Sequence, residues 1–245
     1  MSGWRGLVGD GLSRLGYCVH RWPVNRFDGM RDALRLLRRM GYAPRVIIDC
    51  GANVGRWTRM ARGVFPGAQV HLVEPQPACA DVLEPFVRRL GRAQLHAVAV
   101  TAPGVSRVRM IGRGTGASVA PAGPPGAGEL ECPATTLDAL LADRVAGADR
   151  ALLKLDLEGH EIAALRGAER LLDAVEVVIA EFQVYEIGGN GLPVFGDLLR
   201  FLEERGYALF DVACLSGRPR DRRLRMGDAV FVRSGTPLLA DGAWA

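Results

Sequence analysis

From Arg45 onward, short apolar runs rich in β-branched residues alternate with segments of helical periodicity. Such alternation is typical of βαβ units, in which helices bury both faces of a parallel sheet. It predicts an α/β domain that spans residues 45–235. The expected strands lie near residues 45–50, 69–73, 94–99, 151–156, 175–181, 207–212 and 228–232. The expected helices lie near residues 53–63, 78–91, 137–146, 161–172 and 194–205.

Three segments depart from this alternation. Residues 1–44 indicate an N-terminal helical extension, and residues 236–245 a short C-terminal tail. Within the extension, residues 30–40 predict an amphipathic helix whose core-facing side carries Met30, Ala33, Leu34, Leu37 and Met40. Residues 101–133 combine short strand patterns with many glycines and prolines, which predicts a β insertion with a mobile loop. This insertion lies either near the active site or on the far side of the domain.

Length and composition indicate a globular protein. With 245 residues, 49% of them hydrophobic, the chain can bury a sizeable core. No apolar run reaches the roughly 18 residues of a membrane span, and residues 1–17 lack a signal-peptide core. We therefore expect a cytoplasmic protein without a membrane span. The cysteines are odd in number and far apart, which predicts neither a disulfide framework nor a zinc cluster; they are Cys18, Cys50, Cys79, Cys132 and Cys214.

The positive charge gathers at the two ends of the chain. The formal net charge is +4, and arginines concentrate in residues 31–39 and 218–225. Such runs either contact nucleic acid or an anionic membrane surface, or form solvated helix faces. The amphipathic pattern of residues 30–40 favours a solvated face, so nucleic acid is not expected as a partner.

A glycine-rich turn follows the first predicted strand. It reads Asp49-x-Gly51-x-Asn53-x-Gly55 and precedes a predicted helix. Glycines let the backbone approach a ligand, and free N–H groups at a helix start favour polar or anionic groups. Glu74 ends the next strand, where a carboxylate can accept hydrogen bonds from both hydroxyls of a ribose. Together these residues predict a site for a ribose-bearing cofactor.

A second polar cluster begins at the end of the strand expected near residues 151–156 and continues into the turn beyond it. It reads Lys154-x-Asp156-x-Glu158-Gly159-His160-Glu161 and holds five ionisable groups. Lys154 is the only lysine among 31 basic residues, which suggests a need for a compact ammonium. In an open parallel sheet, ligands bind at the switch point between neighbouring strand ends, here those of Asp49 and Asp156. The two motifs are therefore expected to face one cavity.

Four sequence runs carry a family resemblance over roughly residues 45–212: I-I-D-C-G-A-N-V-G-R-W-T, V-E-P-Q-P, T-T-L-D and L-L-K-L-D-L-E-G-H-E-x-x-x-L-R-G-A-E. With them the chain resembles the FkbM family of S-adenosylmethionine-dependent O-methyltransferases. The resemblance implies a class I methyltransferase (Rossmann-like) fold, an α/β three-layer sandwich. Its seven-stranded sheet would be mostly parallel, with an antiparallel last strand. S-adenosylmethionine is then the expected cofactor, with contacts from Asp49, Gly51, Asn53, Gly55, Glu74 and Asp156.

Methyl transfer to a hydroxyl needs an aligned acceptor and a base that removes the hydroxyl proton. His160 has a suitable intrinsic pKa, although it could equally be a surface residue at a helix start. Lys154 either pairs with a carboxylate or binds the acceptor. Acceptor hydroxyls or a divalent cation could instead be bound by the acids Asp156, Glu158, Glu161 and Glu181, of which the last ends the next strand. The predicted catalytic set is His160, Lys154, Asp156 and Glu181.

A divalent cation such as Mg²⁺ is a less favoured alternative. Asp156, Glu158 and Glu161 could hold it, and the metal would lower the pKa of the acceptor alcohol. Glu161 has a simpler explanation, because the helix dipole stabilises an acid at a helix N-terminus. No metal is therefore assigned.

The leading hypothesis is a methyltransferase that acts on a hydroxyl of a small-molecule, sugar or natural-product acceptor. Two alternatives stay open. An RNA methyltransferase is supported only by the arginine-rich ends, without the aromatic residues that interleave with basic residues in many RNA-binding surfaces. A non-catalytic subunit that binds S-adenosylmethionine or a nucleotide would be expected to have lost the strand-end acids. The oligomeric state is left open, and an oligomer is compatible with the sequence.

Overall fold

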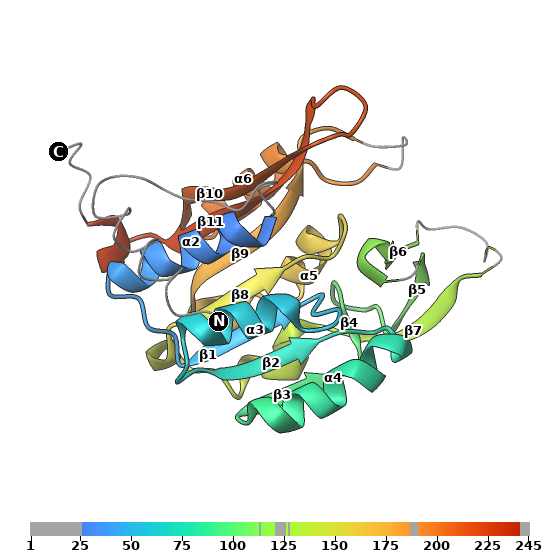
Figure 1. The fold of residues 1–245 in the computed structure, drawn as a ribbon, viewed down its shortest axis with the longest axis horizontal. Helices are drawn as coiled ribbons and strands as arrows, with labels where there is room; N and C mark the ends of the chain where they lie inside the picture. Colours follow the sequence, from blue (N-terminus) through green and yellow to red (C-terminus); the bar gives the residue numbers. More distant parts are fainter. Residues whose placement is uncertain (1–25, 113, 121–125, 127, 187–190, 241–245) are drawn as a thin grey trace, which may run out of the picture.

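The computed structural model describes residues 26–112, 114–120, 126, 128–186 and 191–240. A seven-stranded sheet forms its centre, in the order β10-β11-β9-β8-β1-β2-β3 (Figure 1). The strands are β1 (Val46–Cys50), β2 (Gln69–Val73), β3 (Ala93–His96), β8 (Ala151–Leu155), β9 (Val175–Gln183), β10 (Tyr207–Gly217) and β11 (Leu224–Arg233). Neighbours from β3 to β9 are parallel, whereas β11 is antiparallel to both β9 and β10. The predicted mostly parallel sheet with an antiparallel last strand is confirmed.

Helices cover both faces of this sheet and complete three layers. They are α2 (Arg26–Arg39), α3 (Arg56–Val64), α4 (Pro77–Leu90), α5 (Glu161–Arg166) and α6 (Phe195–Glu203). Successive strand residues point to opposite faces of the sheet. Because helices cover both faces, the central strands carry apolar side chains on both. In β1, Ile48 packs into the core shared with α5 and α6, whereas Ile47 packs into the core shared with α2, α3 and α4. The predicted three-layer α/β fold is confirmed.

Helix α2 lies against β10 and α3, because its apolar stripe is buried there. Gly29 permits this packing, since a Cβ atom at this position would lie 2.0 Å from the carbonyl oxygen of Ala213 in β10. The predicted core-facing side is correct except for Met40, which is 41% exposed. The reason is that the helix ends at Arg39, so residue 40 leaves the buried stripe.

A second, four-stranded sheet has the order β4-β7-β5-β6. Its strands are β4 (Ala99–Val100), β5 (Arg107–Ile111), β6 (Ser118–Val119) and β7 (Leu130–Thr135), to the right of the main sheet in Figure 1. The strand predicted near residues 94–99 is therefore divided, because β3 ends at His96 and β4 pairs with β7 instead. Parts of three predicted segments lie outside the described residues, namely 1–25 of the extension, 113, 121–125 and 127 of the β insertion, and 241–245 of the tail.

The helix predicted near residues 161–172 is shorter than expected. It ends at Arg166, and the next residue lies against the backbone of Thr101. A Cβ atom at Gly167 would be 2.2 Å from that carbonyl oxygen, so only glycine fits. The helix predicted near residues 137–146 is reduced to a short π-helical turn (Asp138–Ala142), and a 3-10 turn (Gly147–Asp149) follows it.

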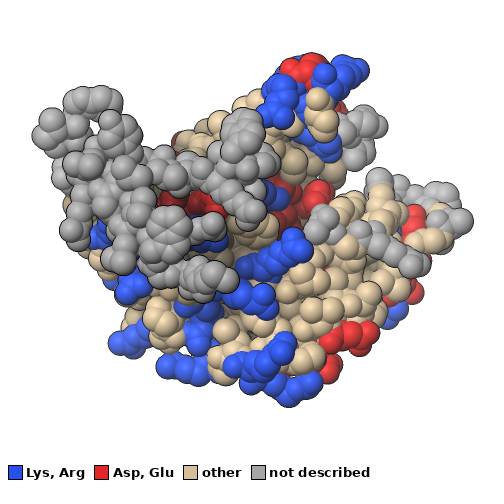
Figure 2. Space-filling view, viewed as in Figure 1, with Lys and Arg blue, Asp and Glu red and all other residues tan. Residues whose placement is uncertain are grey.

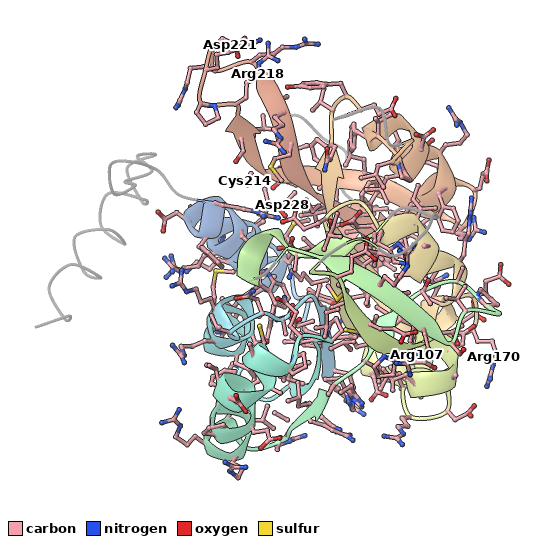
Figure 3. The ribbon with its side chains drawn as sticks, turned by 90° about the vertical axis from the view of Figure 1, so that its right-hand side faces the viewer. Arg107, Arg170, Cys214, Arg218, Asp221 and Asp228 are labelled. Atoms are coloured by element: carbon pink, nitrogen blue, oxygen red, sulfur yellow. The ribbon has the colours of Figure 1, made fainter. Side chains whose placement is uncertain are left out.

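The β10–β11 hairpin extends beyond the rest of the sheet. Figure 2 shows charged side chains gathered at its tip, and Figure 3 labels Arg218 and Asp221 there. These two residues form an exposed ion pair, with 2.5 Å between Nη2 and Oδ2. Among the described helices, none has the length and hydrophobicity of a membrane span. The cysteines that the structure describes are all free thiols.

Candidate active site

A cavity of about 420 Å³ opens at the carboxyl ends of β1, β2 and β8. Its volume falls within the roughly 300–1,000 Å³ of small-molecule sites. Acidic side chains line a hollow on this side of the molecule, below the β10–β11 hairpin (Figure 2). The predicted site residues on its wall are Gly51, Asn53, Glu74, Lys154, Asp156, Glu158 and His160. The other predicted site residues do not line it: Asp49, Gly55, Glu161 and Glu181.

The β1–α3 turn is shaped by contacts with the protein itself. Gly51 has a φ of 77°, and a Cβ atom there would lie 2.0 Å from the carbonyl oxygen of Asp156. Gly55 has a φ of 74°, and its Cβ atom would meet the ring of Phe86 at 2.7 Å. Because other residues do not tolerate both the backbone angle and the contact, Gly51 lets the ends of β1 and β8 come together, and Gly55 lets the turn pack against α4.

Glu74 fixes the shape of the turn on the other side of the cavity. Its Oε2 accepts a hydrogen bond from the N–H of Asn53 at 2.8 Å, and its Oε1 accepts one from the N–H of Gln76 at 3.0 Å. Each carboxylate oxygen has a further lone pair, so Glu74 can still accept hydrogen bonds from two ligand hydroxyls. This is the arrangement that a ribose diol requires.

The N-terminus of α3 provides donors. The helix begins after Gly55, which offers no side-chain cap, so the first N–H groups of the helix are not capped by this residue. Trp57, in the first turn, lines the cavity and is 5% exposed. Its indole Nε1 is buried and has no acceptor among the described residues. A buried donor without an acceptor is costly, which indicates that a ligand group meets it.

Lys154 lies beside the cavity in a buried ion pair. Its Nζ is 3.1 Å from Oδ1 of Asp49 and donates to the carbonyl oxygen of Gly51 at 3.2 Å. Thr58 donates to the other oxygen of Asp49 at 2.5 Å. Burial alone would lower the pKa of Lys154, but the carboxylates of Asp156 and Asp49 outweigh it and raise that pKa. Lys154 is therefore a fixed cation, and Asp49 is its counter-ion behind the cavity wall.

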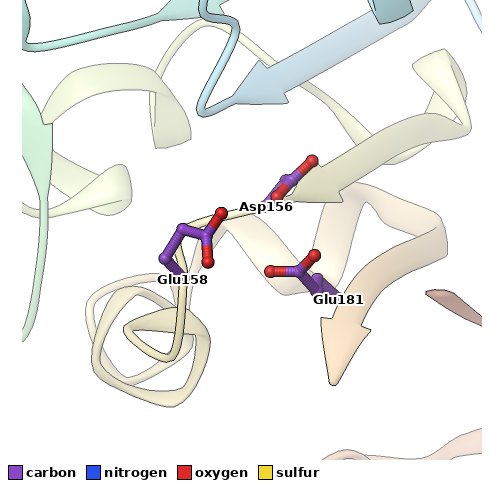
Figure 4. A group of neighbouring side chains, drawn as sticks. All are labelled: Asp156, Glu158 and Glu181. Atoms are coloured by element: carbon purple, nitrogen blue, oxygen red, sulfur yellow. The ribbon is translucent and has the colours of Figure 1, made fainter. Parts of the chain in front are cut away.

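Three acidic side chains gather at the ends of β8 and β9 (Figure 4). One carboxylate oxygen from each of Asp156, Glu158 and Glu181 lies within 4.8 Å of the others. Burial opposes ionisation of Asp156, but Lys154 and Arg26 lower its pKa overall. Burial, followed by the charge of Asp156, raises the pKa of Glu181 to about 9. Asp156 is thus the charged member that faces the cavity, and Glu181 lies behind it.

Glu161 does not belong to this group. Its Oε1 accepts hydrogen bonds from the N–H groups of Leu157 at 2.8 Å and Gly159 at 3.3 Å. Burial raises the pKa of Glu161 to about 7, although these backbone bonds oppose the shift. It holds the β8–α5 turn rather than facing the cavity. Of the three residues considered from the sequence as metal ligands, only Asp156 and Glu158 therefore lie close together. The third acid beside them is Glu181.

His160 is presented to the cavity by the same turn. Its Nε2 lies 2.9 Å from Oγ1 of Thr101, within hydrogen-bonding distance. Burial lowers its pKa, so the ring is neutral near pH 7. A neutral imidazole held by one hydrogen bond can accept a proton.

Sequence reasoning missed several residues of the cavity wall, among them Trp57, Arg26 and Gln76. The sequence around Trp57 and Arg26 gives no indication of a binding role, apart from their positions at the starts of two helices. Gln76 could have been found, because it directly follows the Glu74-Pro75 pair. Its side chain makes two hydrogen bonds with the backbone of Gly114, at 2.9 and 3.2 Å. These bonds hold the β5–β6 connection at the cavity.

A family model described as "Methyltransferase FkbM domain" matches residues 49–209, more than half of the chain. The chain belongs to the FkbM methyltransferase family. The family predicted from the sequence runs is confirmed, and this FkbM protein is an S-adenosylmethionine-dependent methyltransferase. Among curated proteins, none matches its sequence significantly.

Solved structures resemble the FkbM protein in fold, at low sequence identity. WbdD bound to a kinase inhibitor has a TM-score of 0.50 and 14% identity, over 84% of this chain and 39% of that chain. Precorrin-6y C5,15-methyltransferase from Geobacter metallireducens GS-15 has a TM-score of 0.46 and 13% identity, over 88% and 93% of the two chains. A third structure is the 1,6-didemethyltoxoflavin-N1-methyltransferase from Burkholderia thailandensis, solved with S-adenosylhomocysteine. It has a TM-score of 0.46 and 15% identity, over 84% of this chain and 78% of that chain.

The cavity of the FkbM protein fits the polar parts of S-adenosylmethionine. Glu74 would accept hydrogen bonds from the ribose hydroxyls. The buried indole N–H of Trp57 and the start of α3 would meet the carboxylate of the methionine part. Gly51 and Asn53 form the wall between them.

Proposed function

We propose that this methyltransferase transfers a methyl group to a hydroxyl of a small-molecule, sugar or natural-product acceptor. One observation carries the proposal: the neutral His160 and the anionic Asp156 face the same cavity as the ribose-type carboxylate of Glu74. A hydroxyl must lose its proton during the transfer, so a positioned proton acceptor is useful. Bound S-adenosylmethionine supplies the electrophilic methyl group.

The roles divide according to protonation state. His160 is the proposed base, because a neutral imidazole can take the hydroxyl proton. Asp156 is the proposed hydrogen-bond acceptor that orients the hydroxyl, since its lowered pKa keeps it ionised. Lys154 keeps its proton and therefore cannot act as the base. Lys154 and Glu181 hold Asp156 in place, and correct alignment supplies much of the rate enhancement in such reactions.

Replacement of Trp57 by phenylalanine is expected to weaken S-adenosylhomocysteine binding roughly 10- to 100-fold, because a hydrogen bond to a charged group contributes about 1.5–3 kcal/mol. The change removes the buried N–H and keeps an aromatic ring in the cavity wall. Titration calorimetry measures the effect. Arg200→Gln, on the exposed face of α6, serves as the control and should bind like wild type. Equal affinity of the Trp57 variant would show that the indole N–H does not bind the cofactor.

Treatment with EDTA is expected to leave turnover unchanged. The cations that contact the acidic group are side chains: Arg26 contacts Asp156 and Glu181, and Lys154 contacts Asp156. The negative charge that would attract Mg²⁺ is thereby partly neutralised. Methyl transfer is measured before and after dialysis against EDTA. Activity that disappears and returns with added Mg²⁺ would instead assign a metal to Asp156, Glu158 and Glu181.

RNA is the second candidate acceptor, and one observation favours it. A groove of about 480 Å³ between α2 and α3 is lined by Arg31, Arg35, Arg38, Arg39, Arg59, Met60, Gly63 and Val64. Arginine forks suit phosphates. If RNA is the acceptor, its affinity should fall steeply with salt, because each phosphate contact releases counterions. If the protein binds RNA and other polyanions with the same weak affinity, RNA is not its acceptor, and the small-molecule proposal stands.

The experiment that tests the proposed function is a methyl-transfer screen. Wild-type enzyme and radiolabelled S-adenosylmethionine are incubated with hydroxylated sugars, polyketide-like alcohols, matched amines and RNA. Released S-adenosylhomocysteine gives the rate, and mass spectrometry locates the new methyl group. We expect an O-methylated small molecule. A methyl group on nitrogen, on carbon or on RNA would contradict the proposal.

A further inference from the structure

Arg26 reaches the acidic side of the cavity from outside the family domain. It is the first residue of α2, whereas the matched family segment begins at residue 49. The side chain of Arg26 lines the cavity. A helix that precedes the family domain thus adds a cation to the site.

The guanidinium of Arg26 contacts carboxylates from three different strand regions. Its Nε and Nη2 donate to the two oxygens of Asp228 in β11, each at 2.5 Å. Its Nη1 lies 2.8 Å from Oε1 of Glu181 in β9, and Nη2 lies 3.4 Å from Oδ2 of Asp156 after β8. The planar fork of arginine allows these contacts at once, which the point charge of a lysine does not.

Two of these carboxyl groups are buried opposite each other. Asp228 and Glu181 are direct partners on neighbouring antiparallel strands, and they are 1% and 2% exposed. Figure 3 places Asp228 beside helix α2. Burial raises the pKa of both carboxyl groups, that of Glu181 to about 9, whereas the guanidinium of Arg26 opposes both shifts. Arg26 therefore holds this pair together at the back of the cavity.

Asp156 is the carboxylate of this network that faces the cavity. Its Oδ2 lies 3.4 Å from Nη2 of Arg26 and also 3.4 Å from Nζ of Lys154. Two cations on one oxygen restrict the rotation of the carboxylate. The orientation of Asp156 thus depends on a residue that lies far from it in sequence.

We propose that Arg26 is a positioning residue for methyl transfer, which binds Glu181 and Asp228 behind the cavity and so holds Asp156 in the orientation that binds the acceptor. The proposal rests on the role proposed above for Asp156. It makes α2 a part of the active site as well as a cover for the sheet.

The test compares wild type with Arg26→Gln and Arg26→Lys. Arg88→Gln is the control, because Arg88 is exposed on α4 and pairs only loosely with Glu84, at 3.7 Å. Arg26→Gln is expected to lower kcat about 100-fold, the effect of a misplacement of about 1 Å. The KM of the donor and the Kd of S-adenosylhomocysteine should not change, since Glu74 and Trp57 are untouched. Arg26→Lys should recover part of kcat, because it keeps the charge without the fork.

Loss of Arg26 could also unfold the protein, so a second variant separates the two effects. Arg26→Gln/Asp228→Asn removes one carboxylate together with the guanidinium, and it should melt near wild type while kcat stays low. Wild-type kcat in either Arg26→Gln or the double variant would overturn the proposal. The rates are measured as S-adenosylhomocysteine release with the acceptor that wild type methylates fastest in the screen. A methyl group on nitrogen would contradict O-methyl transfer, while the same rates would still decide the role of Arg26.

Discussion

Replacement of His160 by glutamine is expected to lower kcat by roughly 10²- to 10⁴-fold, the range that a general base contributes. Glutamine keeps a polar group near Thr101 but cannot take a proton at neutral pH. The KM of the donor should stay the same, because the proposed cofactor contacts lie after β1 and β2 and at the start of α3. Steady-state rates of S-adenosylhomocysteine release, with the acceptor found by the screen, measure both constants.

The pH profile gives an independent check on His160. Burial lowers its pKa from the ordinary value of 6.5, so the neutral, active form persists at that pH and is protonated only further into the acid range. Wild-type kcat/KM should therefore be level as the pH falls to about 6.5 and should decline only below it. The decline should be absent from the residual activity of the His160 variant. A variant with near-wild-type kcat and the same acid decline would show that another group is the base.

Replacement of Lys154 by methionine is expected to destabilise the protein by about 3–5 kcal/mol, because it leaves a buried carboxylate without its partner. Asp49 is fully buried, and Lys154 is 3% exposed. For a chain of this size, such a loss corresponds to a fall in Tm of roughly 6–20 °C. Thermal denaturation followed by circular dichroism measures it. The account also expects Lys154→Arg to lose turnover, since the larger planar head does not fit among the contacts of the ammonium.

The control for Lys154 is the double variant Asp49→Asn/Lys154→Met. Removal of both charges should recover most of the lost stability, because no unpaired charge remains in the core. Arg200→Met, on the exposed face of α6, should change stability by less than about 0.5 kcal/mol. If Lys154→Met melted like wild type, the Asp49–Lys154 pair would not stabilise the fold.

Much of the fold could be predicted because its central strands are buried on both faces. Strands β1 and β8 are fully buried, and each is apolar except for one charged residue, Asp49 in β1 and Lys154 in β8. Strand β10 is longer than predicted. The side chains in its outer half are only partly buried, and Leu215 there is 58% exposed, so this half lacks the pattern of a buried strand. After the end of α5 at Arg166, Gly167 packs against Thr101, a contact between distant residues that no local pattern encodes.

The candidate site could be predicted only where chain direction brings residues together. Parallel neighbours end at the same edge of a sheet, so the turn after β1 and the Lys154 segment after β8 were expected to meet, and Asp49 pairs with Lys154. Sequence proximity was misleading for Glu161, because its carboxylate accepts a hydrogen bond from the N–H of Leu157 in the preceding turn. Arg26 could not be found in this way, because its contacts depend on how α2 packs across the sheet.

The central claim is that one cavity holds the donor and presents its methyl group to the acid-lined acceptor side. A crystal structure of the protein with S-adenosylhomocysteine tests it most directly. The account predicts that the ribose hydroxyls bind Glu74, that the carboxylate lies at Trp57 and the start of α3, and that the sulfur faces Asp156 and His160. A ribose bound away from Glu74, or a sulfur atom directed away from Asp156, would contradict it.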